Sequence, residues 1–289
     1  MINPSKHLRK IENCPWCGIS VDNSKELYKT EYDCTTVECD CGFVYSNKIL
    51  NKEGLAVYWR NYESNIHMAD LSLNDKRMKM YELESDFILK YLKKDSLVLD
   101  VGCSGGEFLD CFSKVIGKNN CEGVEFGEEA YNIASKKYHV YFGEFPKIKL
   151  EKKYDLVIFR GTIQYFINPK TYIKKAFEIL KDGGILYITS SPNADSFCFK
   201  LFKEKFTLPV NYTDYYGYKE PLLTDYIREI GGELIAQKYF YKETPYADIE
   251  HDIERVAEAI RDVNTKGVVS KASPAFFDNM LTLVYKKLD

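Results

Sequence analysis

Short strand-like runs alternate with segments of helical apolar periodicity from residue 96 to residue 192. The runs occupy residues 97–101, 121–125, 139–142, 154–161 and 185–189, and the helical segments occupy 108–116 and 171–181. The run at 154–161 is nearly continuous in apolar residues, which is typical of a strand covered on both faces. Strands that alternate with helices predict an α/β fold with a parallel sheet.

The C-terminal part continues this alternation with longer connections. Leu222–Ile230 and Pro245–Val263 have the apolar spacing of helices, whereas Glu233–Tyr241 and Asn279–Lys287 read as strands. Residues 194–220 are rich in Phe and Tyr and predict either a lid or a helix packed over the sheet edge. We expect three units: a module at 1–50, a helical connector and lid at 51–95, and the α/β domain at 96–289.

A glycine-rich turn follows the first strand of the α/β domain. It reads Asp-Val-Gly-Cys-Ser-Gly-Gly from Asp100 to Gly106. Glycines let a ligand approach the backbone closely, and open α/β sheets bind ligands where parallel strands end. A dinucleotide-binding turn is disfavoured because Glu107 stands at the third glycine position, and no Gly-Lys-Ser/Thr follows for a phosphate loop.

The turn resembles motif I of class I S-adenosylmethionine-dependent methyltransferases, Asp-x-Gly-Cys-Gly-x-Gly, with Ser104 in place of the middle glycine. The resemblance implies a Rossmann-like sheet of seven strands flanked by helices, with an antiparallel end. It also implies S-adenosylmethionine as cofactor, contacted by Asp100, Gly102, Cys103 and Gly106.

Further cofactor contacts are expected at the ends of the next strands. Glu125 ends the second strand, and a carboxylate there can accept two hydrogen bonds from a ribose diol; the alternative is a solvated acid. By resemblance, Glu144 is a candidate for the adenine amino group, and Arg160 and Gly161 are candidates at the end of the fourth strand. Tyr58 and Tyr62 are candidates to close the site over the cofactor.

The segment after the fourth strand, residues 159–169, resembles motif IV of the small-molecule methyltransferases. Many relatives carry a histidine where this chain has Gln164-Tyr165, so a general base cannot be transferred directly. Tyr165 is one candidate, although a tyrosine has an ordinary pKa of about 10. His251, which lies among carboxylates, is the other; it reads equally as a solvated helix residue. His67 is an outside candidate.

Cysteine spacing predicts a metal site in the N-terminal module. Cys14 and Cys17 form a Cys-x-x-Cys turn, and Cys39 and Cys41 form a Cys-x-Cys pair. Two such pairs about twenty residues apart are typical of a zinc ribbon with a structural, four-coordinate zinc ion. Because Cys-x-Cys is tighter than the usual spacing, Cys34 remains an alternative fourth ligand.

Composition limits the partners. The chain has 40 Lys and Arg residues against 43 Asp and Glu residues, a net charge of −3, which disfavours a nucleic-acid partner. No apolar run is long enough for a membrane span, and residues 1–10 lack the apolar core of a signal peptide. We therefore expect a cytoplasmic protein.

These observations together predict a zinc-bearing class I methyltransferase. The resemblance favours a small-molecule acceptor such as a sugar, a nucleotide sugar or a related metabolite. An RNA methyltransferase with a zinc module and a non-catalytic binding protein of the same fold are the alternatives. The acceptor atom (oxygen, nitrogen or carbon) and the oligomeric state stay open.

Overall fold

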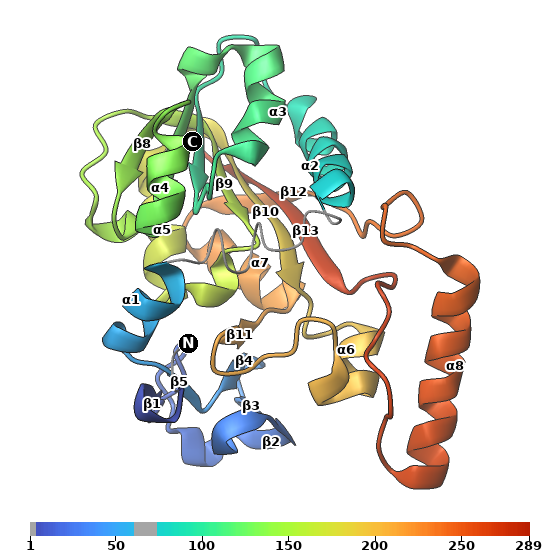
Figure 1. Cartoon of the computed structure of the whole chain (residues 1–289). Coiled ribbons are helices and arrows are strands. Elements are labelled where there is room, and N and C mark those ends of the chain that lie inside the picture. The colour runs from blue at the N-terminus through green and yellow to red at the C-terminus, as the bar shows by residue number, and fades with distance from the viewer. Residues whose placement is uncertain (1–3, 61–73) are drawn as a thin grey trace.

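The computed structural model describes residues 4–60 and 74–289, and its largest element is a seven-stranded sheet (Figure 1). The strand order is β12-β13-β10-β9-β6-β7-β8. β13 runs antiparallel to both of its neighbours, and the β10, β9, β6, β7 and β8 pairings are parallel. The expected seven-stranded α/β sheet with an antiparallel end is therefore confirmed. The strands span β6 (Val98–Val101), β7 (Cys121–Glu125), β8 (His139–Phe142), β9 (Tyr154–Arg160), β10 (Leu180–Pro192), β12 (Gly232–Gln237) and β13 (Met280–Lys287).

Helices cover both faces of this sheet because successive strand side chains point to opposite sides. Leu156 and Ile158 pack with α2 (Asn74–Leu89), α3 (Glu107–Ile116) and α4 (Glu128–Ala134). Val157 and Phe159 pack instead with α5 (Pro169–Ile179) and α7 (Glu220–Glu229). The parallel strands are thus buried on both faces, as their apolar sequences predict.

Helix α2 buries a different face from the one that its apolar residues suggest. Met80, Leu83 and Phe87 are only half-buried. The buried positions are Tyr81, Glu84, Ser85 and Ile88. An acid lies in the middle of this face because it has a cationic partner on the sheet, which is described below.

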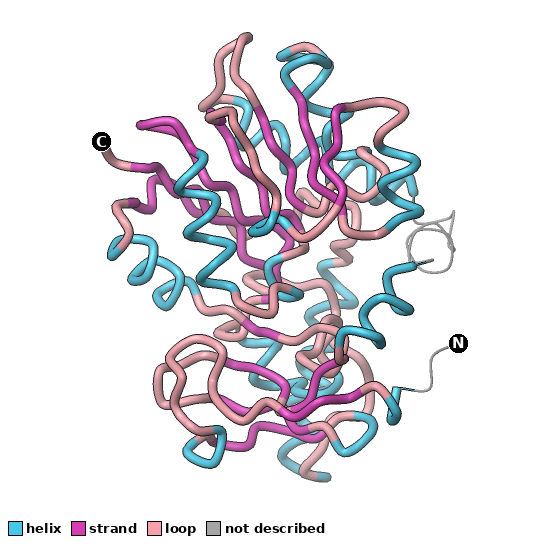
Figure 2. Tube along the Cα trace, turned by 90° about the vertical axis from the view of Figure 1, so that its left-hand side faces the viewer, coloured by secondary structure: helices cyan, strands magenta, loops and turns pink. Residues whose placement is uncertain are grey.

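A second, smaller sheet belongs mainly to the N-terminal module, which lies below the large sheet in Figure 2. Its strand order is β11-β4-β3-β2, with β2 (Lys25–Lys29), β3 (Thr35–Glu38), β4 (Val44–Ser46) and β11 (Tyr216–Gly217). β1 (Leu8–Lys10) pairs separately with β5 (Lys48–Leu50). Strand β11 comes from the aromatic segment 194–220, so that segment is joined to the module by backbone hydrogen bonds.

Side chains strengthen this connection between the module and the large domain. Tyr215, Tyr216 and Tyr218 are buried, and Trp16 of the module contacts Tyr218 and Tyr226 edge-on, with ring centroids 6.3 and 5.4 Å apart. One apolar core therefore runs from the module to α5 and α7. The division at residue 50 and the lid at 194–220 stay predictions.

The remaining helices lie at the edges of this arrangement. Helix α1 (Lys52–Arg60) follows the module, and α6 (Phe197–Phe202) precedes β11. Helix α8 (Ile249–Lys266) lies in the connection between β12 and β13 and stands at the side of the molecule opposite α1 (Figure 1). Short 3-10 turns are η1 (Pro4–Lys6), η2 (Val21–Asn23), η3 (Glu31–Asp33), η6 (Lys118–Asn120), η7 (Phe145–Lys147), η8 (Ile163–Tyr165) and η9 (Lys203–Lys205). Over residues 4–60 and 74–289, no helix has the length and apolarity to cross a membrane.

Candidate functional site

The glycine turn between β6 and α3 has a backbone that most residues cannot adopt. Gly102 and Gly106 have φ values of 82° and 86°, a region that favours glycine. A Cβ on Gly102 would also lie 2.5 Å from Cγ2 of Thr162. The turn is fixed to the next strand because the Gly102 and Cys103 N–H groups donate to the Val124 carbonyl over 2.8 and 3.1 Å.

Glu125 lies across this turn. Its carboxylate accepts the backbone N–H groups of Ser104 (2.8 Å), Phe126 (2.7 Å) and Gly127 (2.7 Å). The side chain is buried at the carboxyl end of β7. The structure thus brings Asp100, Gly102, Cys103 and Gly106 together with Glu125, as the spacing suggested.

Three buried polar atoms at or after the ends of β6 and β9 have no hydrogen-bond partner in the described part of the chain. Asp100 Oδ1, Thr162 Oγ1 and Gln164 Oε1 accept no hydrogen bond from the described residues. Burial raises the pKa of the Asp100 carboxyl to about 7; Arg160 opposes this shift, and Glu125 and Glu107 add to it. Because buried polar atoms are nearly always paired, these atoms fit a site that a polar, cationic ligand completes.

Arg160, at the end of β9, is held by an acid that sequence reasoning missed. Its Nε donates to Glu84 Oε2 over 2.6 Å, and the guanidinium lies 4.1 Å from the centre of the Tyr81 ring. Glu84 Oε1 accepts the hydroxyls of Thr189 (2.7 Å) and Ser190 (2.6 Å). The sequence signal for Glu84 was its position, because an acid at residue 84 shares one helical face with Tyr81 and Ile88.

Tyr165 lies in η8, directly after β9, and has an acidic partner. Its hydroxyl donates to Asp214 Oδ1 over 2.9 Å. Its ring meets Trp59 edge-on at 5.1 Å and Tyr215 at 6.4 Å between centroids. Burial raises the pKa of the Asp214 carboxyl. Sequence reasoning missed Asp214, since it looks like part of a polar turn within an aromatic segment.

Other predicted residues lie at varying distances from the turn. Glu144 follows Gly143, whose N–H donates to the Glu125 carbonyl over 2.9 Å, and Glu144 itself pairs with Lys147 at 2.6 Å. The Gly161 N–H donates to the Thr189 carbonyl. Tyr58 contacts the Trp59 ring on α1. Tyr62 and His67 lie outside the described residues.

His251 is not brought to the glycine turn. It lies in the first turn of α8 with its side chain 77% exposed, and its Nδ1 is 2.9 Å from Asp248 Oδ2. Helix α8 stands apart from α1 and α4 (Figure 1). His251, the other candidate for the general base, therefore pairs with Asp248 at an exposed helix start, and its catalytic role stays a prediction.

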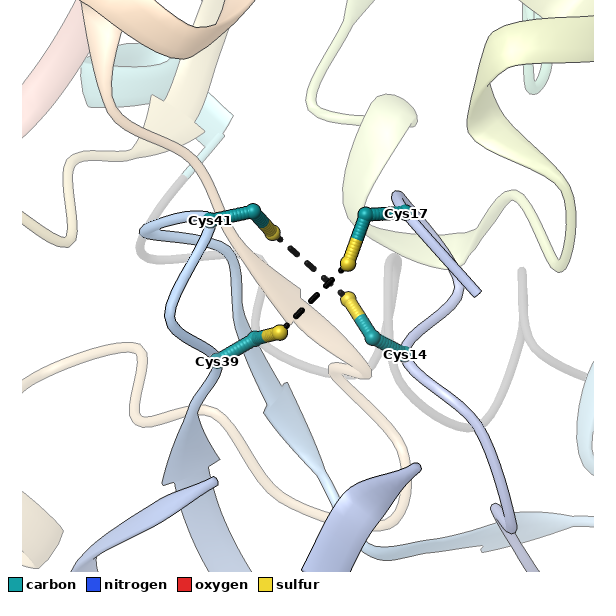
Figure 3. A group of neighbouring side chains, drawn as sticks. All are labelled: Cys14, Cys17, Cys39 and Cys41. Carbon is teal, nitrogen blue, oxygen red and sulfur yellow. Dashed lines mark hydrogen bonds between the residues drawn. The ribbon is translucent and has the colours of Figure 1, made fainter. Parts of the chain in front are cut away.

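Four cysteine thiols converge in the N-terminal module (Figure 3). The Sγ atoms of Cys14, Cys17, Cys39 and Cys41 all lie within 4.8 Å of one another. The Cys14–Cys41 and Cys17–Cys39 sulfur distances are 3.8 and 3.5 Å. A tetrahedral zinc ion with bonds of ~2.3 Å separates its sulfur ligands by ~3.8 Å. The geometry therefore fits zinc.

Two tight turns arrange these thiols. Gly18 and Gly42 have φ values of 79° and 87°, and their N–H groups donate to the carbonyls of Cys14 and Cys39 over 2.9 and 2.7 Å. Cys34 lies outside the cluster, with its Sγ 3.8 Å from the Tyr32 carbonyl. Cys39, rather than Cys34, therefore lies with the other three thiols.

Comparison with known proteins identifies a family whose model matches this chain. The family model described as "Methyltransferase domain" matches residues 75–242. A malonyl-[acyl-carrier protein] O-methyltransferase of Priestia megaterium is 23% identical over 150 residues, which are 50% of this chain and 54% of the relative. A ubiquinone biosynthesis O-methyltransferase of Hydrogenovibrio crunogenus is 26% identical over 135 residues, 43% and 55% of the two chains.

A solved structure from Thermotoga maritima, described as an SAM-dependent methyltransferase and possible histamine N-methyltransferase, shares the fold. It is 20% identical with a TM-score of 0.53, and the match covers 80% of this chain and 99% of that one. The chain spans about half the length of the curated relatives it matches. The cysteine cluster and α8 lie outside the family match.

Proposed function

Since the chain belongs to the family of methyltransferase domains, we propose that it transfers a methyl group from S-adenosylmethionine to a small-molecule acceptor. The observation that carries this proposal is the glycine turn closed by Glu125. Gly102 and Gly106 leave the backbone open to a ligand, and the buried carboxylate lies at the end of the neighbouring strand. Open α/β sheets bind their ligands at this position.

The residues around the turn suit the parts of this cofactor. Glu125 would accept the ribose hydroxyls, and Glu144 would accept the adenine amino group. Asp100 supplies a buried negative charge for the cationic methionine end. Arg160, oriented by Glu84, supplies a positive charge for the methionine carboxylate. Gly161, φ 59°, leaves room beside it.

S-adenosylmethionine supplies a methyl group on a positively charged sulfur. A nucleophile attacks the methyl carbon in line with the carbon–sulfur bond and displaces the sulfur. Because the methyl group is already activated, the chain mainly has to position the acceptor and exclude water. Trp59 and Tyr165 form the aromatic wall of the site after β9, and the buried Tyr215 packs behind Tyr165. A sugar, a nucleotide sugar or a related metabolite is the acceptor class that we propose. The two relatives named above are both named as O-methyltransferases, one for malonyl-[acyl-carrier protein] and one for ubiquinone biosynthesis.

The four thiols hold a structural zinc ion in this proposal. With Cys14, Cys17, Cys39 and Cys41 as ligands, the tetrahedral coordination is complete and leaves no open position for substrate. A module of this size has little core of its own, so zinc binding would contribute to its folding.

Calorimetric titration with S-adenosylmethionine tests the proposed function. We expect the intact protein to bind one equivalent. Glu125→Gln, which weakens the acceptor for the ribose diol, should raise Kd by roughly tenfold or more, about 1.4 kcal/mol. Glu128→Gln is the matched control, because Glu128 is an exposed acid in the first turn of α4. Absence of binding at millimolar cofactor would reject the proposal.

A further inference from the structure

The Tyr165–Asp214 pair involves the segment that follows β9, the strand beside β6. Strand β9 is the sheet neighbour of β6, so the segments that follow the two strands lie side by side. Thr162 bridges them, because its Cγ2 faces Gly102 and its carbonyl accepts the Tyr165 N–H over 3.0 Å. Trp59 extends this wall, since its carbonyl lies close to Gly127 beside Glu125.

Asp214 is held in one orientation and has no cationic partner among the described residues. Asn211 Oδ1 accepts the Asp214 N–H over 2.9 Å, which fixes the turn. Oδ1 of Asp214 accepts the Tyr165 hydroxyl (2.9 Å), and Oδ2 accepts the Thr213 hydroxyl (3.2 Å). The other ionisable groups on this side are Tyr215, and beyond it Tyr216 of β11, Arg9 of β1 and Tyr58 of α1.

We propose that Tyr165 and Asp214 form a proton relay that deprotonates a neutral hydroxyl on a ring-shaped acceptor. This inference rests on the proposed methyl transfer and goes beyond it by selecting the acceptor group. A carboxylate acceptor carries no proton at neutral pH and needs no relay. A hydroxyl must lose its proton as the new bond forms, and a positioned base assists this loss.

The proton and charge balance is complete with these two residues. The acceptor oxygen forms a bond to the methyl carbon, and the carbon–sulfur electron pair passes to the sulfonium, which becomes a neutral thioether. The acceptor hydroxyl proton moves to the Tyr165 oxygen while the Tyr165 proton moves to Asp214. Because burial raises its pKa, Asp214 holds a proton more readily than an exposed aspartate does. It then releases that proton to solvent.

The aromatic wall indicates the shape of the acceptor. The half-buried Trp59 ring meets the Tyr165 ring nearly at right angles, with an interplanar angle of 84°, and the buried Tyr215 ring supports Tyr165 from the core. Such faces pack against flat or ring-shaped apolar surfaces. Phenols and sugars both present a hydroxyl on a ring, so the experiment has one arm for each.

The test measures S-adenosylhomocysteine formation with three probes: catechol, thymidine diphosphate glucose and octanoate. We expect turnover of one or both ring hydroxyl compounds and none of octanoate. Tyr165→Phe and Asp214→Asn should each lower kcat by roughly 10²–10³-fold, and the double variant should lose little more because the two act in series. The acid limb of the kcat–pH profile should disappear in Asp214→Asn.

Two control variants remove similar groups elsewhere. Tyr226→Phe removes a hydroxyl that donates to the Lys170 carbonyl over 3.2 Å, and Asp262→Asn removes a buried carboxyl on α8. Both should retain wild-type kcat. Unchanged circular dichroism and cofactor Kd in Tyr165→Phe and Asp214→Asn would separate catalysis from folding.

Three results would overturn the relay: turnover of octanoate alone, turnover of neither ring compound by protein that binds cofactor, or wild-type kcat in Tyr165→Phe. None of these results would argue against S-adenosylmethionine as the cofactor. Failure of the wild-type protein to bind S-adenosylmethionine would instead reject the proposed function itself.

Discussion

At the scale of single residues, local chemistry explains what could be predicted from sequence. Asp100, Gly102 and Gly106 lie within seven consecutive residues, and their pattern specifies a turn. The position of Glu125 at a strand end could be predicted because the strands recur at regular intervals along the chain. Glu84 and Asp214 could not be found in this way, since their partners Arg160 and Tyr165 lie 76 and 49 residues away. Only the folded chain shows these pairs.

Cofactor affinity should depend on pH through Asp100. Burial raises its pKa from 3.8 to about 7, so in the folded protein the carboxyl is protonated below this value and ionised above it. A positively charged cofactor favours the ionised form. If only that form binds, Kd for S-adenosylmethionine should fall by about tenfold between pH 6 and pH 8, and Asp100→Asn should remove this dependence. Calorimetry across that range provides the measurement.

The raised pKa of Asp100 also makes the stability of the cofactor-free protein depend on pH. Stability falls as pH rises, whereas cofactor affinity increases. The unfolded carboxyl ionises near 3.8 and the folded one only near 7. This group therefore stabilises the folded state least above pH 7, and its contribution declines as pH rises between the two values.

A cofactor affinity that is flat with pH in the wild-type protein would contradict the role given to Asp100.

At the scale of elements, strand positions followed closely from apolar pattern, and the orientation of one helix did not. The apolar residues of helix α2 suggest packing through Met80, Leu83 and Phe87, yet the structure buries Tyr81, Glu84 and Ile88. Hydrophobicity alone cannot show that an acid belongs in a core. Its burial is compensated by Arg160, Thr189 and Ser190, which come from β9 and β10.

Glu84→Gln tests how far this ion pair holds α2 against the sheet. The substitution keeps the side-chain shape but leaves the Arg160 charge without its counter-ion in a mostly buried site. Losing one partner of a buried pair should lower the free energy of unfolding by roughly 3–5 kcal/mol. Urea denaturation gives this value. Asp86→Asn, an exposed acid on the same helix, should change it by less than about 0.5 kcal/mol.

At the scale of the whole molecule, the module and the large domain share one core. Strand β11 completes the module's sheet, and Trp16 packs against Tyr218 and Tyr226. The cysteine spacing indicated a separate metal-binding unit, but it could not reveal this connection, because β11 comes from a segment about 170 residues further along the chain.

Zinc removal should therefore weaken the chain beyond the module. We expect purified protein to contain close to one equivalent of zinc by atomic absorption, and chelation should lower Tm in a single thermal transition. Cys39→Ser should have a similar effect because it removes one of the four gathered thiols. Cys34→Ser should retain zinc, since this buried cysteine lies outside the cluster. Zinc loss in Cys34→Ser with retention in Cys39→Ser would reverse the ligand assignment.

The most direct test of the account is a crystal structure of the protein with S-adenosylhomocysteine bound. The account predicts the cofactor product along the turn from Gly102 to Gly106, with its ribose hydroxyls on Glu125 and its sulfur facing Tyr165. The space beyond the sulfur should be bounded by Trp59 and Tyr165. Product bound elsewhere, or bound at the turn without a contact between Glu125 and the ribose, would contradict the central claim.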